Sequence, residues 1–90
     1  MKSLKIEVKE VIEHCGAKHK KGDSFFIKGK GMIEIPGNNG FCIYAIASLM
    51  PFLTAKQRED EFSDDDWVPK TTELCCPDPN GVIFKISSLD

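Results

Sequence analysis

The sequence lacks any long apolar run. A membrane-spanning helix needs about 20 consecutive apolar residues, and no window of this chain approaches that length. The residues after Met1 lead directly into an alternation of polar and apolar side chains, so we expect neither a signal peptide nor a membrane span. We therefore expect a cytoplasmic protein, in which cysteine thiols stay reduced or bind metal.

An excess of basic charge is also missing. The net charge is -2 and the isoelectric point is about 5.6, whereas non-specific nucleic-acid binding relies on a basic face. We therefore expect no nucleic-acid partner. Lysines gather over residues 18–30 and acidic residues over 59–66, and we interpret both groups as solvated surface. Self-association into a homo-oligomer through these opposite charges stays an open alternative.

Several signatures of known sites are absent. The acidic run lacks the glycine and the distal glutamate of a calcium loop. No glycine-rich phosphate loop precedes a helix, and the carboxylates do not surround an apolar centre as paired catalytic acids would. The C-x-x-C pairs of zinc fingers and ribbons are missing too. The sequence therefore does not decide whether the protein is an enzyme.

The pattern of apolar residues predicts a single domain over residues 1–90. Alternation of apolar and polar side chains, punctuated by turn-forming residues, indicates four strands. We expect them at residues 4–13, 24–28, 32–35 and 82–86. Gly29 and Gly31 mark a hairpin connection between the second and third strands.

The segment from Phe41 to Met50 is almost wholly apolar with helical spacing, so we expect a mostly buried helix. Pro51 removes a backbone donor and is expected to end or kink that helix, with an amphipathic continuation to Glu61. Asp66 and the residues before it resemble the cap of one further helical turn. Together these elements predict an α+β fold: a small antiparallel sheet or partial barrel of about four strands, with one mostly buried, Pro-kinked helix across one face.

Four cysteines and two histidines are the chemically distinctive residues. Cys15 and His19 lie in one segment, Cys42 in a second and Cys76 in a third, each at the expected end of an element, where sites are usually built. These four side chains could converge on one metal ion. Three thiolates and one imidazole suit zinc, and the same set could hold iron or an iron-sulfur cluster.

The role of such a metal centre is left open. With four protein ligands the metal would be structural, and its binding would supply much of the folding free energy. If His19 is not a ligand, three cysteines leave an open position, and His14 or His19 could carry protons in an undefined catalytic role.

Two other classes of function compete with metal binding. In a thiol redox protein, Cys42 at the start of a helix would be the reactive thiolate, and Cys15 or Cys76 would resolve it. In a non-enzymatic interaction module, the cysteines would be inert, and the aromatic residues would mark the core and a dimer or partner surface.

Four stretches also carry a resemblance: H-C-G-A-K-H-K-K-G-D-S-F at 14–25, G-F-C-I-Y-A at 40–45, D-W-V-P at 66–69 and C-P-D-P-N-G at 76–81. Through them the chain resembles, over nearly its whole length, an uncharacterised family of proteins of about ninety residues from anaerobic bacteria and archaea. No biochemical activity is established for that family.

The resemblance implies which sulfurs form the set. The family pattern places cysteine at the positions of Cys15, Cys42 and Cys76 and histidine at that of His19. It thereby implies that Cys75 is dispensable. Where the family often has proline after the first cysteine, this chain has glycine, which loosens the loop without removing a ligand.

Overall fold

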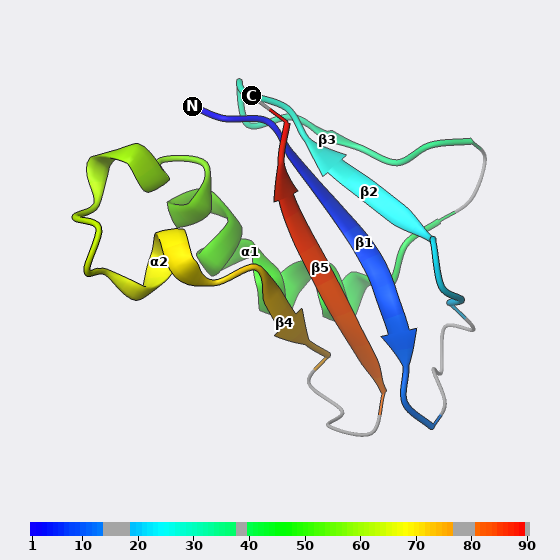
Figure 1. The fold of residues 1–90 in the computed structure, drawn as a ribbon. Helices are drawn as coiled ribbons and strands as arrows, with labels where there is room; N and C mark the ends of the chain where they lie inside the picture. Colours follow the sequence, from blue (N-terminus) through cyan, green and yellow to red (C-terminus); the bar gives the residue numbers. More distant parts are fainter. Residues whose placement is uncertain (14–18, 38–39, 77–80, 90) are drawn as a thin grey trace.

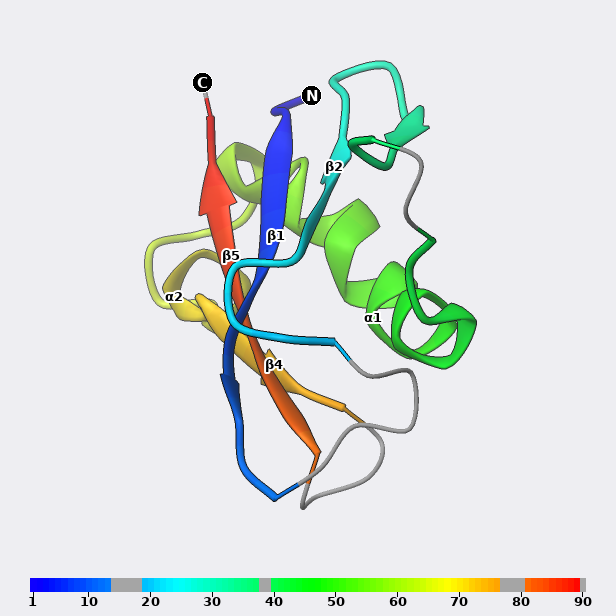
Figure 2. The same ribbon diagram turned by 90° about the vertical axis from the view of Figure 1, so that its right-hand side faces the viewer.

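The computed structural model describes residues 1–13, 19–37, 40–76 and 81–89, and an antiparallel sheet forms its centre (Figure 1). In chain order the elements are strands β1 (Leu4–Val11), β2 (Ser24–Ile27) and β3 (Ile33–Glu34), helix α1 (Ile43–Lys56), 3-10 helix η1 (Glu59–Glu61), helix α2 (Trp67–Lys70), and strands β4 (Glu73–Cys75) and β5 (Val82–Ser88). The sheet order is β3-β2-β1-β5-β4, and α1 crosses one face of it (Figure 2).

The register of the central strands directs their apolar side chains to one face. Ile6 of β1 lies opposite Phe25 of β2 on one side and Ile86 of β5 on the other. Successive side chains of a strand point to opposite faces, so this pairing gathers every second residue of all three strands in one layer. A register shift between Val8 and Glu10 interrupts the β1–β5 pairing near the end of β1.

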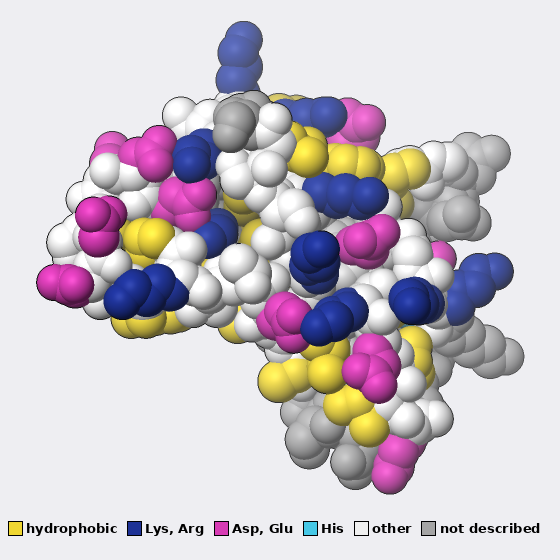
Figure 3. Space-filling model, in the orientation of Figure 1, with side chains coloured by type: hydrophobic (Ala, Val, Ile, Leu, Met, Phe, Trp, Pro, Cys, Tyr) yellow, Lys and Arg dark blue, Asp and Glu magenta, His cyan; other side chains and the backbone are white. Residues whose placement is uncertain are grey.

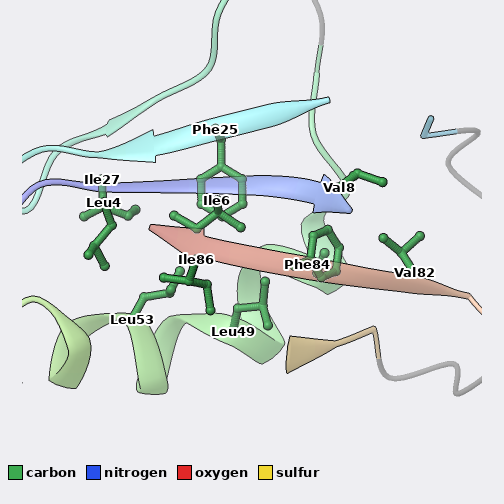
Figure 4. Packing of buried hydrophobic residues seen from close by; sticks show 11 residues of the cluster. Leu4, Ile6, Val8, Phe25, Ile27, Leu49, Leu53, Val82, Phe84 and Ile86 are labelled. Carbon is green, nitrogen blue, oxygen red and sulfur yellow. The ribbon is translucent and has the colours of Figure 1, made fainter. Parts of the chain in front are cut away.

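Helix α1 closes the core from the other side. Ala45, Leu49 and Leu53 recur every four residues and are buried. Leu49 and Leu53 point from the helix toward Phe84 and Ile86 of the sheet (Figure 4). Burying each leucine contributes about 1.5 to 3 kcal/mol, so this single helix face fixes the two-layer arrangement.

The structure confirms the predicted fold class, an α+β protein with an antiparallel sheet and one main helix. The sheet has five strands rather than about four, and it is not a closed barrel. The additional strand is β4, which pairs with β5 at the sheet edge and places Leu74 opposite Phe84. A three-residue strand is too short to show a sequence period of its own.

Helix α1 continues through Pro51 to Lys56 instead of ending there. Pro51 leaves the carbonyl of Ala47 without an amide partner, but both residues are exposed, so water can reach that carbonyl. The burial of the helix is confined to one face. The predicted cap of the next helical turn is confirmed, because an Asp66 carboxylate oxygen accepts a 3.0 Å hydrogen bond from the amide of Val68 at the start of α2.

Candidate interaction site

His19 anchors the N-terminal end of α1. Its Nε2 accepts a 3.0 Å hydrogen bond from the backbone amide of Cys42, the residue that precedes the helix. Since that nitrogen accepts, the ring proton lies on Nδ1, which is 3.1 Å from an Asp23 carboxylate oxygen and donates to it. The ring packs on Phe41 at a centroid distance of 4.3 Å, and the His19 side chain is only 8% exposed.

Asp23 holds this histidine in place from within the same turn. Its carboxylate accepts hydrogen bonds from the backbone amide of Lys20 and from the His19 ring. Both hydrogen bonds hold the pKa of Asp23 below its usual value, and the one from Lys20 has the larger effect. The arrangement orients the imidazole toward the helix as a carboxylate orients many functional histidines. Here the other ring nitrogen meets a backbone amide rather than a thiol.

The predicted metal-binding function is wrong for the part of the chain that the structure describes. No group of three His, Cys, Asp or Glu side chains among those residues could hold a metal ion. His19 has both ring nitrogens in hydrogen bonds, and Cys42 and Cys76 are half-buried side chains packed against the hydrophobic core. Cys15, a member of the predicted set, and His14, a predicted proton carrier, lie outside the described residues, so the place of Cys15 in that set, the role of His14, and zinc, iron or an iron-sulfur cluster as cofactor stay predictions.

The redox alternative fails on the described residues as well. Cys42, Cys75 and Cys76 are free, and no two of them lie within disulfide distance. A pairing of Cys42 with Cys15 falls outside the described residues. Exposed Cys75 ends edge strand β4, while Cys76 donates its backbone amide to Val82 at 2.8 Å. The interaction-module alternative does not depend on either finding.

A different feature stands out on the outward side of α1. Tyr44, Ala47, Pro51 and Thr54 are all exposed and recur three or four residues apart, so they share the helix face opposite the core; we call these four residues the outer stripe. Tyr44 is 76% exposed, and Ile43 beside it is 72% exposed. No charged residue occurs from Phe41 to Ala55.

The polar atoms beside the outer stripe are largely satisfied within the helix. The hydroxyl of Ser48 donates to the carbonyl of Ala45 at 3.1 Å, and that of Thr54 donates to the carbonyl of Pro51 at 3.0 Å. These hydroxyls can therefore be covered without losing their partners, which removes the usual cost of burying them.

An aromatic pair joins α2 to the C-terminal half of α1. Trp67 of α2 stacks on Phe52 at a centroid distance of 5.4 Å and is itself 62% exposed. Exposed tryptophan and tyrosine side chains are enriched at protein interfaces. The pair extends the apolar surface beyond the helix itself.

The C-terminal end of α1 is held by buried charges. The Lys56 ammonium, almost fully buried, lies 2.6 Å from one carboxylate oxygen of Glu59 and donates to the carbonyl of Pro69 at 3.0 Å. The other Glu59 oxygen accepts from Lys2 at 2.9 Å. Burial alone would raise the pKa of Glu59, but the hydrogen bonds from Lys56 and Lys2 outweigh it and hold the pKa below its usual value.

Gln57 ties the same end of the helix to the sheet. Its buried side-chain amide donates to the carbonyls of Lys2 at 3.0 Å and Lys28 at 2.9 Å. The backbone amide of Lys2 returns a 2.9 Å hydrogen bond to the Gln57 carbonyl. The helix that presents the outer stripe is therefore fixed at both ends.

The face of the sheet away from α1 differs in character. Lysine and acidic side chains intermingle over the strands (Figure 3), and several lysines lie in exposed ion pairs such as Lys9–Glu73 at 2.6 Å and Lys28–Glu34 at 3.6 Å. Exposed pairs of this kind add little stability. Their mixed sign is typical of a solvated surface.

Sequence reasoning missed the outer stripe because an apolar helix was taken to be buried. The signal was present, since fifteen consecutive uncharged residues give the helix no charged side for solvent. Such a helix in an α+β fold with a single covering layer exposes apolar surface on its far side.

None of the described helices is both long and apolar enough to cross a membrane. Comparison of the chain with protein-family models, with curated proteins and with solved structures gives no match.

Proposed function

We propose that the protein is a non-enzymatic interaction module that docks an amphipathic helix of a partner protein on the outer stripe of α1. The observation that carries this proposal is the exposed, uncharged face of a helix whose two ends are anchored to the sheet. A helix laid against such a face buries apolar surface from both partners. Fixed ends mean that little conformational entropy is lost on docking.

The shape of the outer stripe favours a helix as the occupant. Its central residues, Ala47 and Pro51, are small or compact, and the large side chain of Tyr44 lies at one end. Small residues at the centre allow two helix axes to approach closely.

The proposal assigns no chemical step to the chain. The one described histidine has both ring nitrogens committed, so it has no free position with which to act as a base toward a substrate. A nucleic-acid partner is not part of the proposal, because glutamates neutralise the lysines of the open sheet face. The free thiols of the described cysteines support a reducing, cytoplasmic location.

The test is a direct search for helix binding. Fluorescently labelled amphipathic peptides, together with scrambled versions of the same composition, are titrated with the protein and followed by anisotropy. Ala47→Glu places a charge in the middle of the outer stripe at an exposed helical position, so it blocks docking without disturbing the core. Ser88→Glu, at another exposed site at the end of β5, is the matched control.

We expect patterned peptides to bind the wild-type protein and Ser88→Glu alike, and to lose binding to Ala47→Glu. The scrambled peptides should not bind, because they present no apolar stripe. Equal binding by Ala47→Glu, or no binding by any patterned peptide, would overturn the proposal.

A further inference from the structure

We draw no further inference here: the strongest candidate, the exposed outer stripe of α1, carries nothing beyond the docking function already proposed for it, because nothing among the residues that the structure describes shows what covers this helix face.

Discussion

The two ends of α1 are fixed by different chemistry. At the N-terminal end a neutral imidazole, His19, accepts one backbone amide and relies on Asp23 for its orientation. At the C-terminal end Lys56 and Glu59 form a buried ion pair, and Gln57 bonds two carbonyls of the sheet strands. Among the described residues, His19 holds the N-terminal end through one neutral hydrogen bond and ring packing on Phe41, whereas the C-terminal end has several contacts that involve charge.

This difference indicates which end of the helix should unfold first. A buried ion pair is costly to break from one side, because the remaining charge is left without its partner. A single neutral hydrogen bond contributes only about 1 kcal/mol net. We therefore expect the C-terminal end to carry the global stability of the two-layer packing, and the N-terminal end to open locally at lower free energy.

The largest expected effect comes from breaking the C-terminal anchor. Lys56→Met keeps the approximate length of the side chain. It leaves Lys2 as the remaining partner of Glu59, and it removes the hydrogen-bond donor of two backbone carbonyls. We expect a loss of about 3 kcal/mol in the free energy of unfolding, measured by urea denaturation with tyrosine and tryptophan fluorescence.

The control for Lys56→Met is the same substitution at Lys70, which is exposed in the last turn of α2. It removes one positive charge without breaking a buried pair, so the free energy of unfolding should change by less than about 0.5 kcal/mol. Equal losses of unfolding free energy for the two variants would mean that breaking the buried pair costs no more than removing an exposed charge.

A smaller effect is expected at the N-terminal end. His19→Ala removes the acceptor for the Cys42 amide and the ring that packs on Phe41, and we expect a loss of about 1.5 kcal/mol. Hydrogen exchange gives the sharper measurement. The Cys42 amide should exchange faster while the core amide of Ile6 changes only with global stability, because the disturbed contact is local.

Adding a chelator to the wild-type protein is the companion experiment for His19. If His19 forms only hydrogen bonds, a chelator should leave the thermal midpoint of the wild-type protein unchanged. His19→Ala should then lower that midpoint by the same amount with and without chelator. A midpoint that falls on chelation only in the wild type would contradict the anchoring role described here, because it would require a metal bound through the imidazole.

Much of the fold could be predicted because the relevant signals are local. The alternation from Leu4 to Val8 and the four-residue spacing of Ala45, Leu49 and Leu53 are determined by side-chain direction within one element. Strand β4 could not be predicted, because its three residues are extended only through pairing with β5. Pro51 was expected to end or kink the helix, and α1 continues through it, because the carbonyl that loses its amide partner is exposed to water.

The site was harder to predict because it depends on contacts between distant residues. His19 and Cys42 do meet, yet through a backbone amide that no side-chain inventory reveals. Their residue types suggested metal chemistry, whereas the geometry shows a helix anchor. The outer stripe was visible as a long uncharged segment, but only the two-layer fold shows that no described element covers one side of that helix.

The smallest expected effect is the pH dependence of the N-terminal anchor. The folded-state pKa of Asp23 is lowered by hydrogen bonds from the Lys20 amide and from His19, so this carboxylate stabilises the fold above its unfolded pKa. That contribution is lost as the pH falls through the folded value. Comparing Asp23→Asn with wild type from about pH 6 to about pH 2.5 should therefore show a stability gap that closes toward acid. A gap that is constant over this range would mean that the Asp23 charge does not support the His19 anchor, and the contrast between the two ends of α1 would then rest on hydrogen-bond number alone.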